Sequence, residues 1–181
     1  QTKEYGAFAD DFVSVFVEMS ITDNLSIGLD YVPQGIESPE NFSREGNKTQ
    51  GAFPDPGQSK VSVDFNDLTT LYLKANIPML GGAYVKGGFA QVDIEVIESM
   101  ASGNTYADTD TKGFIAAIGY SHEITDGLSL RAEVMAHQFD DAETDNGVGK
   151  SSGSSANGGR NEVKVAEMWG ARGTISLVKS F

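Results

Sequence analysis

The sequence predicts an all-β protein, an antiparallel up-and-down transmembrane β-barrel in which residues 1–181 form a single domain. Three observations lead to this fold class. Apolar and polar residues alternate with a period of two along the whole chain, whereas helical periodicity is not seen. The connections between these segments are alternately short and long. Aromatic residues lie near the ends of the apolar faces, as they do in barrels of the outer membrane.

The first half of the chain predicts four strands, at 11–21, 25–31, 61–77 and 83–97. Apolar residues occupy alternate positions in each, so that one face would be apolar and the other polar. The odd-numbered residues carry the apolar face in the first three strands. In the fourth, Val92 and Ile94 carry it and Lys86 falls on the same side, out of phase. We expect a bulge at Gly87 and Gly88 to correct the phase, because glycine within a strand often marks one.

The second half predicts three further strands, at 114–120, 128–137 and 163–181. In the middle one, Leu130 and Val134 share the apolar face, opposite Arg131 and Glu133. The apolar face of the last strand ends on the aromatic Phe181. The whole chain therefore predicts seven strands.

Short turns are expected at 21–24, 78–82 and 125–127, and long loops at 33–60, 98–112 and 140–161. Thr125-Asp126-Gly127 contains the Asp-Gly pair that is typical of tight hairpins. All the short turns then fall at one end of the barrel and all the long loops at the other. This asymmetry is typical of outer-membrane barrels, whose periplasmic turns are short and whose external loops are long.

Composition excludes several classes of protein. The chain has no cysteine, which excludes a disulfide scaffold or a thiolate metal site, and its net charge of −13 argues against nucleic-acid binding. No apolar run reaches the roughly 18 residues that a transmembrane helix needs. A chain of this kind can cross a membrane only as a closed barrel, because lipid offers no hydrogen-bond partner to an open sheet edge.

Alternation alone does not separate a membrane barrel from a soluble, lipocalin-like ligand-binding barrel, since both have one apolar face. Aromatic residues at the strand ends favour the membrane, where they would form two belts at the interfaces. The residues expected there are Phe65, Phe114 and Trp169 on the long-loop side and Tyr120 and Phe181 on the short-turn side.

The final segment, VKVAEMWGARGTISLVKSF, resembles the closing strand of small outer-membrane barrels of the OmpA and OmpX type. Phe181, Leu177 and Ile175 match the pattern of a terminal aromatic preceded by alternate apolar residues, while Lys179 stands where an aromatic is usual. The segment LSLRAEVMAHQFDD also resembles the preceding strand of such proteins. The resemblance implies eight strands, the bacterial outer membrane as location, the barrel-assembly machinery as partner, and lipid and lipopolysaccharide as neighbours.

The polar face predicts a charged interior. Alternation places these residues inside the barrel: Glu18, Asp30, Asp64, Lys74, Asp93, Glu95, Arg131, Glu133, Lys164 and Arg172. Charges inside a small barrel must be paired or hydrated. We therefore expect a network in which Lys74, Arg131 and Arg172 are engaged by Glu18, Glu133 and Asp93.

No catalytic, cofactor or metal site is expected. Ser121, His122 and Glu123 are neighbours on one strand and point to alternate faces, so they cannot form a triad among themselves. His137 lies on the same face as Glu133 without an assigned nucleophile. The acidic run after residue 139 lacks the glycine that an EF-hand loop requires after its third acidic ligand.

These observations favour a non-enzymatic outer-membrane protein with a structural and surface-presenting role. Its acidic loops at 33–60, 98–112 and 140–161 would contact the environment, a phage or another surface ligand. The alternatives are a narrow channel for ions or small solutes, a lipid-modifying enzyme and a soluble ligand-binding barrel. Because bacterial barrels have even numbers of strands, we also expect one more amphipathic strand before Gln1, paired with both the first and the last strand.

Overall fold

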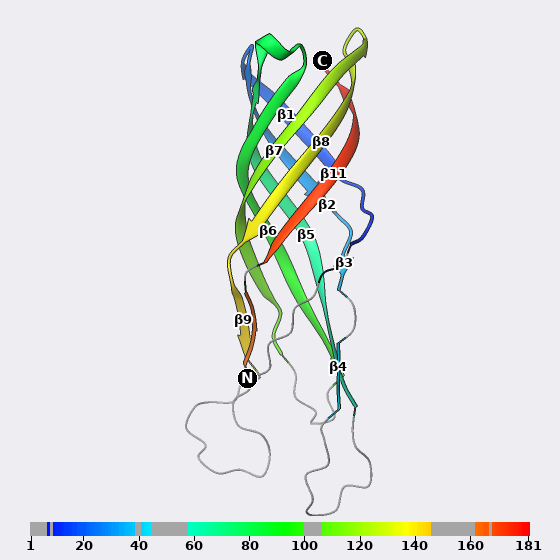
Figure 1. The fold of residues 1–181 in the computed structure, drawn as a ribbon, viewed down its shortest axis with the longest axis vertical. Helices are drawn as coiled ribbons and strands as arrows, with labels where there is room; N and C mark the ends of the chain where they lie inside the picture. Colours follow the sequence, from blue (N-terminus) through cyan, green and yellow to red (C-terminus); the bar gives the residue numbers. More distant parts are fainter. Residues whose placement is uncertain are drawn as a thin grey trace, which may run out of the picture.

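The computed structural model describes residues 7, 9–38, 41–44, 58–99, 106–145, 162–166 and 168–181. Its main sheet has the order β1-β2-β5-β6-β7-β8-β11, and each neighbouring pair on this path is antiparallel (Figure 1). These strands are β1 (Val15–Thr22), β2 (Leu25–Val32), β5 (Gln58–Asn76), β6 (Ala83–Ser99), β7 (Thr109–Thr125), β8 (Leu128–Phe139) and β11 (Trp169–Lys179). The predicted all-β, antiparallel architecture is confirmed for the described part of the chain.

Three short turns join strands at the end of the molecule that is uppermost in Figure 1. Between β1 and β2, the Thr22 hydroxyl accepts hydrogen bonds from the backbone N–H groups of Asn24 and Leu25 at 3.3 and 3.1 Å. A single 3₁₀ turn, η1 (Pro78–Leu80), lies between β5 and β6. Gly127, between β7 and β8, has a φ of 70°, a conformation that glycine adopts without steric cost.

The opposite end carries more strand than the sequence predicted. Within the expected loop 33–60, β3 (Ile36–Glu37) and β4 (Asn41–Arg44) both pair with β5. Beyond β8, β9 (Ala142–Asp145) and β10 (Glu162–Val165) form a separate two-stranded sheet. The expected strand 163–181 is therefore divided between β10 and β11. Residues 39–40, 45–57, 100–105 and 146–161 of the three long connections lie outside the described residues.

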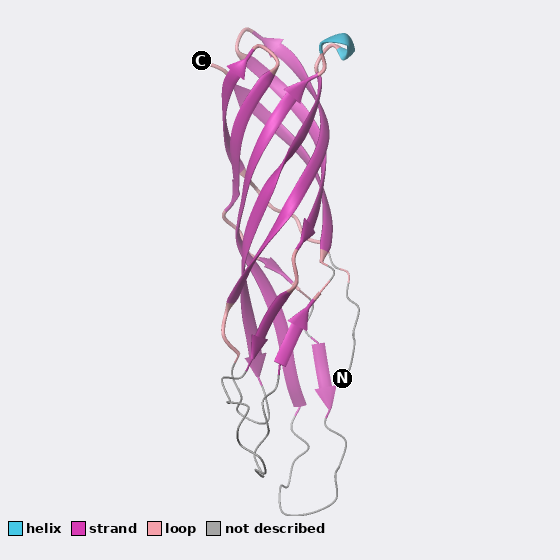
Figure 2. Cartoon of the chain, turned by 90° about the vertical axis from the view of Figure 1, so that its left-hand side faces the viewer, coloured by secondary structure: helices cyan, strands magenta, loops and turns pink. Residues whose placement is uncertain are grey.

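The sheet curls on itself. Figures 1 and 2 show its strands crossing obliquely in front of and behind one long axis. Side chains from strands that are not neighbours in the sheet meet in the interior: Glu18 of β1 contacts Arg131 of β8, and Asp30 of β2 contacts Arg172 of β11. Within the described residues, no backbone pairing joins β1 to β11.

A bulge in β5 reverses the expected orientation of its outer half. The register with β6 shifts between Asn66 and Thr69, and Asp67 lies in the left-handed region with a φ of 54°. Each such extra residue exchanges the two faces of the strand that follows. Phe65, expected on the lipid-facing side, therefore packs partly buried against the interior core, and Asp64 no longer shares the side that Lys74 occupies.

The bulge expected at Gly87 and Gly88 in β6 is absent, because the register with β7 runs without a shift from Ala83 to Ile94. One face of β6 is buried throughout this stretch, and Lys86 lies on it together with Val92 and Ile94. Asp93 and Glu95 are exposed on the opposite face. Their expected place in the interior was wrong: the apolar residues of this half of β6 face inward.

Candidate functional site

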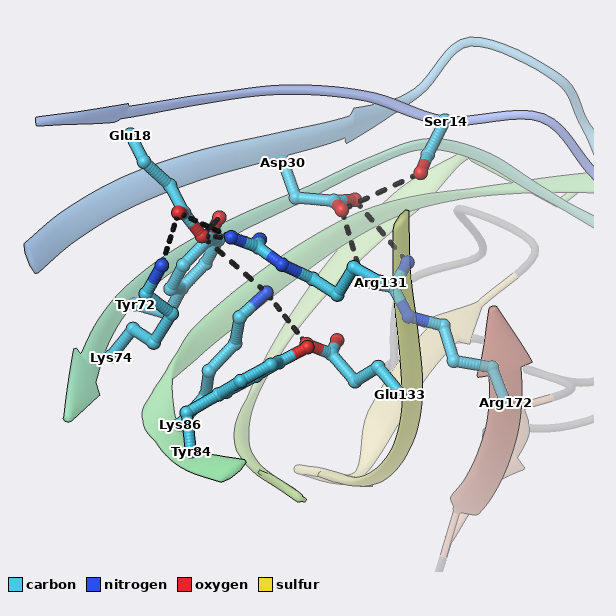
Figure 3. A network of polar contacts seen from close by, with 10 residues as sticks. All are labelled: Ser14, Glu18, Asp30, Tyr72, Lys74, Tyr84, Lys86, Arg131, Glu133 and Arg172. Atoms are coloured by element: carbon cyan, nitrogen blue, oxygen red, sulfur yellow. Dashed lines mark hydrogen bonds and ion pairs between the residues drawn. The ribbon is translucent and has the colours of Figure 1, made fainter. Parts of the chain in front are cut away.

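The carboxylate of Glu18 is the centre of a polar cluster inside the curled sheet (Figure 3). Its two oxygens accept hydrogen bonds from the two terminal guanidinium nitrogens of Arg131, at 2.7 and 2.8 Å. The Nζ of Lys74 donates to the same carboxylate at 2.6 Å, and the hydroxyl of Tyr72 donates at 2.8 Å. Glu18 thus ties β1 to β5 and to β8, across the interior.

A second carboxylate, that of Glu133 on β8, extends the cluster. The Nζ of Lys86 lies 2.8 Å from it, and the Tyr84 hydroxyl donates to it at 2.7 Å. Lys86 also lies 3.8 Å from Glu18, so that it bridges the two carboxylates, and its Nζ is 4.0 Å from the centre of the Tyr72 ring. A cation this close to an aromatic face gains electrostatic stabilisation in addition to its ion pairs.

Two glycines make room for the tyrosines. Gly28 of β2 is paired with Tyr72, and Gly119 of β7 is paired with Tyr84. A Cβ atom on Gly28 would lie 2.4 Å from the Tyr72 ring, and one on Gly119 would lie 2.2 Å from the Tyr84 ring. The rings therefore lie over the neighbouring strands where only glycine leaves space.

A separate ion pair joins β2 to β11. Arg172 approaches the carboxylate of Asp30 at 3.2 and 3.3 Å, and both side chains are buried. Ser14, just before β1, donates to the same carboxylate at 3.5 Å. The Asp30–Arg172 pair links the edge strand β11 to β2, and the Glu18–Arg131 pair links the edge strand β1 to β8.

The cluster is richer in cations than in anions. In the described interior, the cations Lys74, Lys86, Arg131 and Arg172 face the carboxylates Glu18, Glu133 and Asp30. Although each guanidinium has a carboxylate partner, the buried Nε atoms of Arg131 and Arg172 have no hydrogen-bond acceptor. Buried charged groups are stable only when they are paired and hydrogen-bonded, so the interior carries unmet donor capacity.

An apolar core fills the interior nearer the long connections. Its fully buried members include Val32, Met135 and Tyr72, and Phe12, Phe65 and Phe139 pack against it. His137 is buried there, with its ring stacked on Phe139 at 5.8 Å between centroids. The interior thus has a charged layer near the short turns and an apolar layer toward the other end.

The outer surface of the sheet carries large apolar side chains, whereas the ion pairs lie inside. Ile118 is 67%, Phe114 62%, Trp169 81% and Ile175 81% exposed, whereas Arg131 inside is only 4% exposed. Of the aromatic residues expected on this surface, Phe114, Tyr120, Trp169 and Phe181 are exposed. Phe65 is the exception, for the reason given above.

Six of the charges expected inside were predicted to form one network, and the structure brings five of these six into ion pairs: Glu18, Lys74, Arg131, Glu133 and Arg172. Asp93 is exposed elsewhere. Sequence reasoning missed Lys86, Tyr72 and Tyr84 as members of the site. The sequence contained one indication that Lys86 is unusual, because this lysine interrupts the apolar series of its own strand.

Lys164 was also expected inside, and this was wrong. It lies on β10, about half exposed, 2.8 Å from Glu143 and 3.0 Å from Asp141. These two carboxylates raise the pKa of Lys164 above its usual value. An exposed pair of this kind contributes little to stability.

The described residues contain no group of three or more His, Asp or Glu side chains placed to hold a metal ion. No helix in the described part of the chain is long and apolar enough to cross a membrane. Comparison with family models, with curated proteins and with solved structures finds no match for this chain.

Proposed function

We propose that this chain is a non-enzymatic β-barrel protein of the bacterial outer membrane, with a structural and surface-presenting role. The observation that carries the proposal is the inverted distribution of side chains over the curled sheet. Ion pairs lie inside, and a contiguous band of large apolar residues lies outside. Soluble monomers rarely expose apolar patches of more than a few hundred Å², whereas lipid acyl chains are the natural solvent for such a band.

Several features of the chain agree with this role. The exposed aromatic residues lie at both ends of the outer band, with Trp169 at one end of β11 and Phe181 just beyond the other. The short turns lie at a single end, and the strands continue past the band as β4 and the β9–β10 hairpin at the other (Figure 1). We propose that this second end is external and meets lipopolysaccharide and surface ligands such as phage. Insertion would then depend on the barrel-assembly machinery.

A pair of substitutions tests the membrane location. Ile118 lies in the middle of β7 on the apolar surface, and Leu80 lies in η1 at the short-turn end; they are 67% and 60% exposed. Ile118→Lys is expected to cost roughly 2–4 kcal/mol of stability in lipid, whereas Leu80→Lys, near the interface, costs about 0–1 kcal/mol. The free energy of unfolding is measured in liposomes, with the gel mobility of unboiled and boiled protein as a check on folding.

In a water-soluble protein the two exposed sites would respond alike, because replacing an exposed apolar residue with lysine changes stability by only about 0.5 kcal/mol. Equal, small effects of both substitutions, together with failure of the wild type to float with liposomes, would refute the membrane location and support the soluble ligand-binding barrel.

A further inference from the structure

The curled sheet has two open edges. Within the described residues, β1 pairs only with β2 and β11 pairs only with β8. Half of the backbone N–H and C=O groups of each edge strand therefore point away from their one partner. A cavity of about 2640 Å³ reaches this opening, since its lining includes consecutive residues of both edges, such as Phe16 and Val17 on β1 and Ile175 and Ser176 on β11.

The directions of these edges determine what can pair with both. The path from β1 to β11 contains seven strands, and each neighbouring pair is antiparallel. β1 and β11 consequently run in the same direction. One additional strand that runs opposite to both would complete an entirely antiparallel cylinder.

The charges inside the sheet determine which side chains an added strand would have to turn inward. Arg172 lies on the edge strand β11, is 7% exposed, and has a buried Nε without an acceptor. The described cluster also holds four cations against three carboxylates. A strand beside β11 that places a carboxylate toward the interior would supply the missing acceptor and balance the charge.

We propose that the opening between β1 and β11 is a binding site for one extended, amphipathic peptide strand. The strand pairs antiparallel with both edges, turns small or polar residues and one carboxylate toward Arg172, and turns apolar residues outward. The apolar outward face rests on the proposed membrane location, whereas the backbone pairing and the carboxylate do not.

A second copy of the chain fits the opening less well. Copies that share one orientation in a membrane have all their β1 and β11 edges parallel to one another. Edge-to-edge contact would then give parallel pairs, and the sheet contains none on its main path. One extended strand that runs opposite to both edges has no such restriction.

The binding test uses a peptide with the sequence of β2, LSIGLDYV, because this segment already pairs antiparallel with β1 and alternates apolar residues with Ser, Gly and Asp. Amide hydrogen exchange of the folded protein in detergent is measured with and without the peptide. Binding is expected to protect the amides of β1 and β11 at least tenfold, and a scrambled peptide without alternation is expected to give no protection.

The role of the carboxylate is tested with one substitution in the peptide and one in the protein. A peptide with Asn in place of its Asp should bind about tenfold more weakly to the wild type. Arg172→Gln should abolish this preference, and Lys164→Gln, a change in an exposed cation outside the interior, should retain it. Because the chain lacks cysteine, Thr174→Cys on β11 and one cysteine in the peptide report the pairing register through disulfide formation.

Unchanged exchange at β1 and β11 in the presence of peptide would overturn the proposal. The proposal would also be overturned if the amides of β1 and β11 were already protected from exchange in the free protein and the protein had twice the mass of one chain. A second copy would then occupy the opening. An equal response of the Asp and Asn peptides would overturn the assigned carboxylate. These readouts are made in detergent and do not depend on the liposome measurements, so the membrane proposal can fail or hold independently.

Discussion

Glu18 accepts hydrogen bonds from Tyr72, Lys74 and Arg131, and it lies on the edge strand β1. Within the described part of the chain, backbone pairing holds this strand from one side only. The carboxylate therefore has two roles: it neutralises cations that would otherwise be buried without sufficient counter-charge, and it holds the edge against strands on the far side of the interior. A carboxylate shared in this way is costly to remove, because its partners remain buried.

Glu18→Gln is accordingly expected to lower the free energy of unfolding by roughly 3–5 kcal/mol. The change keeps the size of the side chain and removes only its charge, which leaves Lys74 and Arg131 under-compensated. Urea-induced unfolding in detergent measures the effect. Lys164→Gln is the matched control, because it breaks an exposed ion pair, which contributes little to stability. Equal, small losses for both variants would show that the interior is hydrated enough to screen its charges.

Sequence reasoning placed the interior charges correctly where the polar and apolar faces of a strand were clearly separated. β8 alternates without interruption, so Arg131 and Glu133 were placed inside from their position in the series alone, and both are buried. Lys86 was not placed, because its apolar neighbours on the same face were taken to face lipid. Val92 and Ile94 are instead part of the interior, and a mixed interior face has no pattern that identifies it in a single sequence.

At the scale of elements, β5 shows why alternation fails over long distances. The strand reads as one continuous alternation from residue 61 to residue 77, yet the bulge at Asp67 exchanges its two faces. In the sequence the break is marked only at its centre, where Asp67 falls in the apolar series and Leu68 in the polar one. The twist and closure of a curled sheet require such irregularities, and their positions depend on pairing with neighbouring strands.

The connection at 140–161 was expected to be a loop; it contains β9, and the β9–β10 hairpin shares no backbone ladder with the main sheet among the described residues. Its cross-strand ion pairs at Lys164 are exposed. By contrast, β3 and β4 are hydrogen-bonded to β5. The two extensions should therefore differ in their contribution to the stability of the sheet.

Replacing residues 140–167 with Asn-Gly is expected to lower the free energy of unfolding by only about 1 kcal/mol, because this pair forms the tight turn that antiparallel neighbours need and the lost ion pairs are exposed. The described side chain of the hairpin that is buried, Ala142, is small. Phe139 and Met168, already joined by a backbone hydrogen bond of 3.0 Å, would flank the new turn. Replacing residues 36–44 with a Gly-Ser segment of equal length, which removes β3 and β4 and keeps the connection to β5, should cost more. Thermal unfolding in detergent measures both variants, and a larger loss for the first would show that the hairpin supports the sheet.

At the scale of the whole molecule, two layers of side chains cross the interior beside the cavity at the β1–β11 opening. The charged layer around Glu18 links β1, β5, β6 and β8, and the apolar layer around Met135 follows it toward the long connections. A barrel of about eight strands has an interior that side chains can fill. Ions would have to break paired charges and then cross an apolar layer, which is unfavourable at both steps.

The wild-type protein in planar lipid bilayers is therefore expected to show no stable conductance of porin size. A triple variant with Tyr72→Ala, Tyr84→Ala and Met135→Ala removes three of the largest buried side chains and should increase the frequency of measurable current steps. A porin in the same apparatus controls for the sensitivity of the recording, and gel mobility before and after boiling controls for folding of the variant. Stable, porin-sized steps from the wild type would contradict an interior closed to ions by the two layers, and would favour a channel along the cavity that reaches the β1–β11 opening.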